Sequence, residues 1–470
     1  MSYAEIIQNI SRAESAWSQE ATPSPTGCRY FDYSAGQPNL YLLMKFKQAL
    51  VAEFGLTKGF AIYRQTVTRH AGARLGARPL ESQLAFAKAR AAAFTELAPA
   101  GEAFIIRPPR VIGPGDHRPL SGSTRSFYIA CLADAHIRGR SEVIDVGECS
   151  LLDFQGLELS RIDDELEFDS AVFHRTNDTV YDIIPGSDAD STEVDEAFTL
   201  LGAHTDFFGH WMCEYLPRYV AAVLSGGVPP VPVLIDAHMP RPHRQALELM
   251  LVDPIPIIEI AAFATVSVCR LWCAPNLSYR PLHERVNERF KWDYLASAPL
   301  RDAPVLEEMS RRADLALGNK SGPGRVFLAR EDFRHRKLVN CAAIETIAKR
   351  RGFALVYPED LDFVEQVRLV RTARFVIAPE GSALFLTFFA RPGLRLCILN
   401  HPLTEALALY EGPLAEKAVD ITVLTGPEVK KGHELPQDSD YRIDETGFSD
   451  FLDGWLAGDG HVGPLPVAMP

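Results

Sequence analysis

Four short apolar runs indicate the fold, namely RVFLAR (residues 325–330), FALVYPE (353–359), FVIAPEGSA (375–383) and LRLCILN (394–400). Between them lie stretches with apolar residues at three- and four-residue spacing, the clearest at Leu338–Arg351 and Phe363–Ala373. Short apolar strands that alternate with helices indicate βαβ units and a parallel sheet covered on both faces. We therefore predict an α/β fold for this half of the chain.

Polar residues stand at the end of each predicted strand. They are Arg330, Glu359, Glu380 and Asn400. Ligands of open α/β sheets bind outside the carboxyl ends of the strands. We therefore expect these side chains to border one crevice.

The length, net charge and cysteine content of the chain limit the class of protein. With 470 residues the chain is expected to form more than one domain. A formal net charge of −13 argues against a nucleic-acid binder. The eight cysteines are scattered, which indicates thiols in a reducing compartment. Because we find neither a secretion signal nor an apolar run long enough to span a bilayer, we expect a cytoplasmic protein, with peripheral attachment to the inner face of the membrane left open.

A second α/β unit precedes the first. It begins with a predicted strand at Phe198–Leu201, a helix at His210–Leu224 and a strand at Val231–Ile235. Residues 103–185 show short alternating runs typical of antiparallel strands, and the acidic residues 186–196 are expected to form a loop. Two α/β units in tandem predict two Rossmann-like domains that face a cleft.

Arg330 and Arg336 belong to a basic turn in an acidic protein. Guanidinium groups at a strand end suit a diphosphate, because they offer fixed bidentate donors. The alternative is a solvated turn in which the arginines pair with Glu331 and Asp332.

The turn Glu380-Gly381-Ser382-Ala383 is a second candidate binding element. Gly381 permits a close approach of the backbone, and the N–H groups of a following helix favour an anion. An ordinary strand-to-helix turn explains the same residues. The turn lacks the glycine spacing of a dinucleotide site, so we predict no nicotinamide cofactor.

His210 and Glu214 are four residues apart and lie on one face of the predicted helix. The carboxylate can orient the imidazole as a general base. Two alternatives remain, a packing role for His210 and a metal site with His204 or Asp206 as a third ligand. Peptidase, hydrolase and nucleoside-triphosphatase motifs are missing from the sequence.

The order and spacing of several motifs resemble glycosyltransferase family 61, whose bacterial members are often described as capsular polysaccharide biosynthesis proteins. The motifs are Gly209-His210-Trp211, Glu214, Leu216-Pro217-Arg218, then Arg330, Arg336 and Asn340, then Gly352-Phe353, Pro358-Glu359 and Gln366, and finally Gly381-Ser382-Ala383. The resemblance implies a GT-B-like fold with a β-rich N-terminal segment. We expect a helical segment at 1–60, a β-rich and acceptor-side domain at 61–300, a donor-binding domain at 301–425 and a tail at 426–470.

The resemblance also implies roles for the candidate residues. The donor is expected to be a nucleotide-diphosphate sugar and the acceptor an oligo- or polysaccharide, with inversion at the anomeric carbon and no metal or other cofactor. Arg330, Arg336 and Asn340 are expected to contact the donor, and Gly381, Ser382 and Ala383 its diphosphate. Glu380 stands where the family usually has histidine. His210, and Glu214 second, are expected to take the proton of the acceptor hydroxyl.

Two other functions stay open at this point. One is a GT-B-like transferase of another group, such as pyruvyl. The other is a catalytically silent binding or scaffold subunit of a polysaccharide assembly. Donor binding followed by release of nucleotide distinguishes a sugar transferase from both.

Overall fold

The structure is a computed structural model. It describes residues 76–106, 108–114, 119–153, 169, 172–175, 180–183, 192–237, 239–251, 254–261, 264–277, 303–318, 321–330, 336–402, 414, 417, 419–430 and 439–457. The helical segment expected at residues 1–60 lies outside the described residues.

A parallel sheet forms the centre of the C-terminal half, with the strand order β16-β15-β17-β18-β19-β4. Its strands are β15 (Arg325–Leu328), β16 (Ala354–Val356), β17 (Phe375–Pro379), β18 (Arg395–Asn400), β19 (Asp420–Thr425) and β4 (Arg110–Ile112). The first four confirm the predicted strands. β19 and β4 extend the sheet beyond them.

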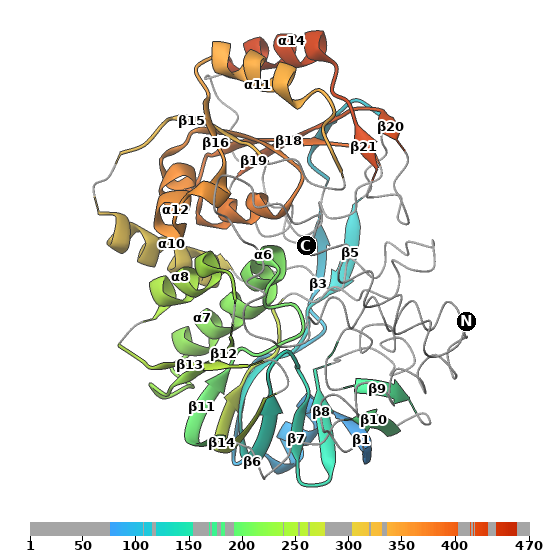
Figure 1. Cartoon of the computed structure of the whole chain (residues 1–470), viewed down its shortest axis with the longest axis vertical. Coiled ribbons are helices and arrows are strands. Elements are labelled where there is room, and N and C mark those ends of the chain that lie inside the picture. Colours follow the sequence, from blue (N-terminus) through green and yellow to red (C-terminus); the bar gives the residue numbers. More distant parts are fainter. Residues whose placement is uncertain are drawn as a thin grey trace, which may run out of the picture.

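Helices cover both faces of this sheet (Figure 1). α11 (Cys341–Arg350) and α14 (Glu445–Ala457) cover one face, and α10 (Ala303–Leu317), α12 (Phe363–Thr372) and η7 (Ser382–Phe389) cover the other. Side chains of β15 alternate between the two layers, as strand geometry requires. Val326 and Leu328 pack with α12, whereas Phe327 packs with α11 and α14.

The predicted helix after Gly381 is a 3₁₀ helix, η7. Its bonds join residues three apart, as in Leu384 N–H to Gly381 O at 3.0 Å and Ala390 N–H to Thr387 O at 2.9 Å. Thr387 and three phenylalanines occupy this segment. β-Branched and aromatic residues are weaker α-helix formers, which is consistent with the tighter helix.

The N-terminal half is built on a mixed sheet, described with eleven strands in the order β13-β12-β11-β14-β6-β7-β8-β1-β10-β9, with β2 paired to β6. Its strands are β1 (Gly76–Ser82), β2 (Ala93–Ala98), β6 (Phe127–Arg138), β7 (Ile144–Val146), β8 (Cys149–Leu152), β9 (Val172–Arg175), β10 (Val180–Ile183), β11 (Thr192–Thr199), β12 (Val233–Asp236), β13 (Ile257–Ile260) and β14 (Thr265–Cys273). The α/β unit supplies the parallel strands β11 to β14, and most pairs of the β-rich segment are antiparallel, as predicted. The expected loop at 186–196 is wrong for residues 192–196, which pair with β14 although their side chains are largely exposed.

Smaller elements complete the described chain. They are α4 (Gln83–Arg90), α6 (Phe208–His210), η4 (Trp211–Tyr215), α7 (Leu216–Leu224), α8 (Arg241–Met250), η6 (Pro358–Asp360), and the strand pairs β3 (Ala103–Ile106) with β5 (Leu120–Ser123) and β20 (Glu428–Lys430) with β21 (Asp440–Tyr441).

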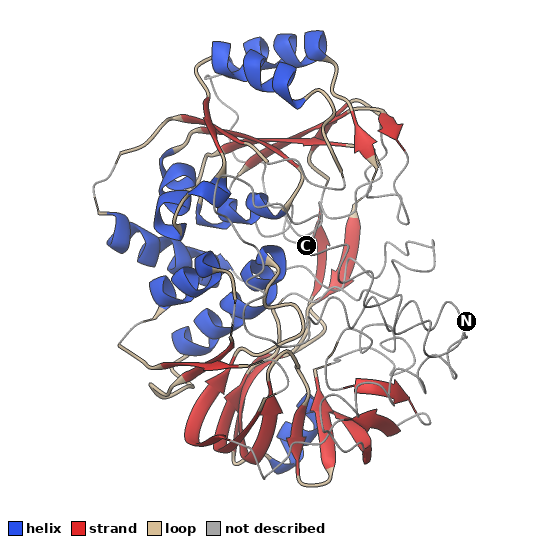
Figure 2. Cartoon of the chain, viewed as in Figure 1, coloured by secondary structure: helices blue, strands red, loops and turns tan. Residues whose placement is uncertain are grey.

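One layer of helices joins the two halves. α7 and α8 from the N-terminal half pack with α10, α12 and η7, and a single apolar core continues from β11 through this layer to β18. Figure 2 shows the helices between the two sheets. β4 strengthens the connection, because it precedes most of the N-terminal sheet in sequence yet pairs with β19.

Candidate active site

The C-terminal sheet has a switch point between β15 and β17. The chain runs from β15 to β16 on one side and returns to β17 on the other. Such a point opens a crevice outside the strand ends, and ligands of doubly wound sheets bind there. Arg330 follows β15 and Glu380 follows β17, so the predicted donor residues lie at this point.

Glu380 connects the two arginines. Its carboxylate Oε2 lies 2.5 Å from Arg336 Nη1, and its backbone carbonyl accepts a hydrogen bond from Arg330 Nη1 at 3.2 Å. The side chain of Glu380 is buried, with 3% of the residue exposed. Arg330 and Arg336 are therefore held to the end of β17, and the alternative of a purely solvated turn does not apply to these two arginines.

The backbone supports this arrangement at two positions. Arg336 has φ +58°, a left-handed conformation that strains a residue with a side chain by about 1–3 kcal/mol. At Gly381, a Cβ atom would lie 3.4 Å from Arg330 Nη1. The Arg330 guanidinium therefore lies against the main chain at Gly381. Strained or closely approached backbone of this kind is often found at functional sites.

The remaining predicted donor residues are placed differently. Gly381 is buried, Ser382 is exposed and Ala383 is half-buried at the start of η7. Asn340 is buried, and its amide donates to Ile443 O at 2.9 Å and to Glu445 Oε1 at 3.1 Å. These bonds hold the segment that enters α14, so in this structure Asn340 has a structural role. Its contact with a donor stays a prediction.

His210 and Glu214 form the pair that their spacing predicts. His210 Nδ1 lies 3.0 Å from each carboxylate oxygen of Glu214. His210 ends α6, and Glu214 lies in η4, a single π-helical turn. π-Helical turns are rare and are frequently found at functional sites.

The loop before His210 is fixed by Asp236, the last residue of β12. Its buried carboxylate accepts from the Gly202 N–H at 3.0 Å, from Thr205 Oγ1 at 2.7 Å and from the Arg140 N–H at 2.6 Å. Burial raises the pKa of Asp236 to about 6. These bonds fix the loop from two sides and so set the start of the His210 helix.

Two histidines complete the support of this loop. His243 Nδ1 donates to Thr205 O at 2.8 Å, and burial lowers the pKa of His243 to about 4, so its imidazole is neutral. The ring of His204 stacks on that of His210, with 4.7 Å between the centroids. The stacking limits rotation of the His210 ring.

The proposed third metal ligands have other partners. Arg140 binds both oxygens of Asp206, at 2.9 Å each, and His204 stacks on His210. In the described part of the chain, His, Cys, Asp and Glu form no group of three that could hold a metal ion.

Sequence reasoning missed Glu142. Its Oε1 accepts a hydrogen bond from the Tyr215 hydroxyl at 2.5 Å, and the same hydroxyl accepts from the His204 N–H at 3.3 Å. Burial raises the pKa of Glu142 to about 7, and the charge of Arg218 opposes this shift. The only local signal is a carboxylate at the start of an apolar run, and its partner Tyr215 is 73 positions away in the sequence.

The two parts of the site meet through α6 and η7. A Cβ atom at Gly209 would lie 3.0 Å from Cε2 of Phe385 in η7. The residue before His210 thus packs against the helix that follows Glu380 and Gly381. A larger residue at this position would require the Phe385 ring to shift by a few tenths of an ångström.

Comparison with known proteins relates the region around this site to one family. Residues 208–397 match the family model described as Glycosyltransferase 61. The match covers less than half of the chain and indicates the glycosyltransferase class. Within that class, the matched region resembles glycosyltransferase family 61, as the sequence motifs indicate, and it contains both the His210–Glu214 pair and the Arg336–Glu380 pair. No curated protein matches the chain in a sequence search.

Proposed function

We propose that this glycosyltransferase moves a hexosyl or pentosyl group from a nucleotide-diphosphate sugar to a hydroxyl of an oligo- or polysaccharide, with inversion at the anomeric carbon. The observation that carries the proposal is the His210–Glu214 pair, which lies in the matched family region and next to η7. In this proposal the two α/β units are the halves of a GT-B-like enzyme. The C-terminal sheet holds the donor, and the N-terminal sheet holds the acceptor.

His210 is the proposed base. Because a carboxylate accepts hydrogen bonds, its contact with Nδ1 places the proton of a neutral imidazole on that atom. Nε2 then carries the lone pair that takes the proton of the acceptor hydroxyl. The acceptor oxygen forms a bond to the anomeric carbon as the bond to the donor phosphate breaks, and Glu214 stabilises the imidazolium.

Arg330 and Arg336 are the proposed partners of the leaving diphosphate, together with the N–H groups at the start of η7. Fixed donors at a developing negative charge lower the barrier without reorganisation. The Glu380 carboxylate competes for Arg336, so it must share or release this guanidinium when a phosphate binds. We propose that the reaction needs no metal ion, because arginines and backbone dipoles supply the positive charge.

The location belongs to the same proposal. We propose that the enzyme works in the cytoplasm on capsular or exopolysaccharide, in solution or attached to the inner face of the membrane. None of the described helices is long and apolar enough to cross a membrane.

A donor screen tests the function. Thermal shift with several nucleotide-sugars identifies the donor, and release of nucleoside diphosphate in the presence of glycan acceptors measures transfer. His210→Ala should abolish release and keep donor binding. Equal release of nucleoside diphosphate by the wild type and by His210→Ala would show that His210 is not the base.

The Arg336–Glu380 pair also supports a second candidate, a silent binding subunit, because a carboxylate occupies part of the proposed phosphate site. Donor binding without release under every acceptor would favour that function.

A further inference from the structure

The turn between β6 and β7, residues 139–143, contacts the segment that carries the proposed base, residues 204–215. Arg140 and Glu142 of this turn reach the segment near its two ends, at Asp206 and at Tyr215. The turn lies outside residues 208–397, which match the family model, and none of its residues is among the site residues predicted from the sequence. Its contacts with the site therefore come from the fold alone.

His210 lies in the first turn of a helix that continues through η4 into α7. Phe207, which precedes α6, makes no side-chain capping bond. The first turn of a helix leaves backbone N–H groups without helical partners, and the π-helical turn interrupts the regular bonding between His210 and Glu214. The orientation of His210 toward Glu214 therefore depends on contacts with the rest of the fold.

Arg140 holds the start of this helix. Its guanidinium lies 2.9 Å from each carboxylate oxygen of Asp206, two residues before α6 begins at Phe208. Its backbone N–H donates to Asp236 Oδ1 at 2.6 Å. Arg140 has φ +65°, a left-handed conformation that is unfavourable for a residue with a side chain. The fold keeps this conformation, in which the backbone and the side chain of Arg140 both bind the loop before the helix or its anchor.

Glu142 holds the other end of the segment through Tyr215. The hydroxyl of Tyr215 donates to Glu142 Oε1 at 2.5 Å and accepts from the His204 N–H at 3.3 Å. Tyr215 is fully buried and follows Glu214 in η4. The ring of His204 stacks on that of His210, with 4.7 Å between the centroids. One carboxyl group thus fixes both the turn that carries Glu214 and the backbone of the residue stacked on His210.

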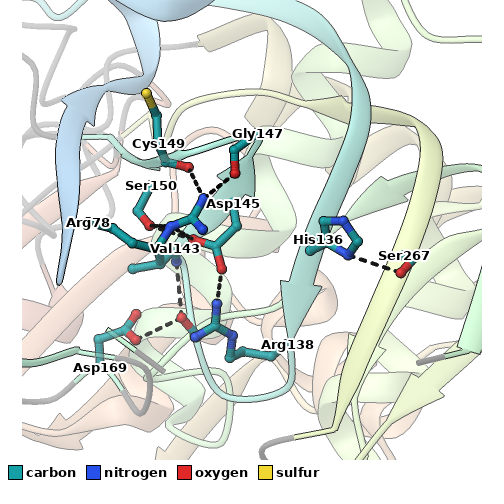
Figure 3. A network of polar contacts seen from close by, with 11 residues as sticks. Arg78, His136, Arg138, Val143, Asp145, Gly147, Cys149, Ser150, Asp169 and Ser267 are labelled. Carbon is teal, nitrogen blue, oxygen red and sulfur yellow. Dashed lines mark hydrogen bonds and ion pairs between the residues drawn. The ribbon is translucent and has the colours of Figure 1, made fainter. Parts of the chain in front are cut away.

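A buried polar network anchors the turn to the sheet. Asp169 accepts from the Ser141 hydroxyl at 2.7 Å and from the Glu142 N–H at 2.8 Å. Arg138, at the end of β6, pairs with Asp145 of β7, and Figure 3 shows both residues beside Asp169. Arg138 is 1% and Asp145 3% exposed. Buried networks of this kind hold one geometry, so the turn is a rigid support for the side chains that it carries.

We propose that Arg140 and Glu142 are positioning residues for His210, and that they set the orientation of its imidazole toward Glu214. The proposal rests on the proposed function, in which His210 takes the proton of the acceptor hydroxyl. A base acts only within hydrogen-bond reach of that proton, and a misplacement of about 1 Å can cost on the order of a hundredfold in rate. Loss of either contact should therefore lower turnover and leave donor affinity nearly constant.

NMR measures the orientation of His210 without any substrate. In full-length protein labelled with carbon-13 histidine, the His210 signal is assigned by its absence from His210→Gln, and its carbon shifts at alkaline pH report which nitrogen carries the proton. The wild type should show one signal, with the proton on Nδ1. Arg140→Gln and Tyr215→Phe should each show a second signal, with the proton on Nε2, because the ring no longer keeps its contact with Glu214. Glu142→Leu should show the same change, whereas Glu142→Gln keeps an accepting oxygen and should retain the wild-type signal.

Two matched variants serve as controls. Arg311→Gln breaks an exposed arginine–glutamate pair on α10, and Tyr128→Phe removes a hydroxyl from a buried tyrosine of β6. Neither should alter the His210 signal. With the donor that the screen identifies, Arg140→Gln and Tyr215→Phe should lower kcat about tenfold or more and leave the donor KM within about twofold. Arg140→Lys, which keeps the charge, should recover part of kcat.

An unchanged His210 signal in both Arg140→Gln and Tyr215→Phe would overturn the proposal, and so would an unchanged kcat in these two variants. If either variant does not fold, Asp206→Asn weakens the partner of Arg140 at a partly exposed position and should alter the same signal. If the wild type releases no nucleotide with any donor, the proposed function fails. The His210 signal then still shows whether Arg140 and Glu142 orient the ring.

Discussion

Replacement of Glu380 by glutamine tests whether the charge of Glu380 weakens phosphate binding at the proposed donor site. The Glu380 carboxylate is buried and lies 2.5 Å from Arg336 Nη1. The amide keeps the size of the side chain and removes its charge. A phosphate that approaches Arg336 then no longer meets a second anion at about 5 Å, a repulsion of about 3 kcal/mol at an effective dielectric constant near 20.

We expect the variant to bind nucleoside diphosphate at least about tenfold more tightly. The free energy of a tenfold gain in affinity is smaller than the full Coulomb repulsion, because the Arg336 side chain is 28% exposed and solvent screens the interaction. Stability should fall. Removal of one partner from a fully buried pair costs about 3–5 kcal/mol, and the exposure of Arg336 reduces the expected loss to about 1–2 kcal/mol.

Calorimetric titration with UDP, GDP, ADP and dTDP in turn measures the affinity, and urea unfolding measures the stability. Glu307→Gln removes the same charge from an exposed position on α10 and serves as the control. Weaker binding by Glu380→Gln would refute the reasoning, because it would show that Glu380 orients Arg336 instead of competing with phosphate. Absence of binding by all four nucleotides would refute the donor site itself.

Three further predictions follow from the same geometry. Arg330→Ala should lower turnover about a hundredfold or more without unfolding the protein, and wild-type turnover would remove Arg330 from the site. Glu214→Gln should lower turnover and shift its pH profile while donor affinity stays constant, because the amide supports the imidazolium poorly; equal losses in donor affinity would indicate a structural role. Burial lowers the pKa of Lys417 from 10.5 to about 7. Between pH 7 and pH 10.5 the Lys417 amine therefore carries a proton in the unfolded chain and has lost it in the folded chain. The free energy of unfolding should rise with pH over this range. Lys417→Met should flatten that rise in urea midpoints measured at pH 7 and pH 9, and an unchanged slope would contradict the assignment to Lys417.

The sequence predicts those parts of the fold that depend on local pattern. β15, β17 and β18 are short, apolar and largely buried, and the edge strand β16 is short, apolar and half-buried, so each is recognisable by itself. β4 has three residues and pairs with a strand more than 300 positions away, and no local pattern can indicate such a partner. The first half of β11 was missed because its side chains are exposed, although its backbone pairs with β14.

In the candidate site, too, contacts between residues close in sequence are predictable, and contacts between distant residues are not. His210 and Glu214 are separated by one helical turn, so their contact follows from spacing. Glu142 meets Tyr215 only through the fold, and its altered pKa arises from burial that a sequence does not display. The family resemblance marks Glu380 as unusual, but its pairing with Arg336, a residue with a left-handed backbone, follows only from the fold.

The place of β4 restricts how the enzyme can move. A hinge between the halves would have to pull β4 away from β19 and also expose the apolar helical layer to water. Both steps resemble partial unfolding more than a swing about a flexible joint. Substrate entry is therefore expected to depend on local rearrangement at the rim, and the two halves should denature together in a single cooperative transition.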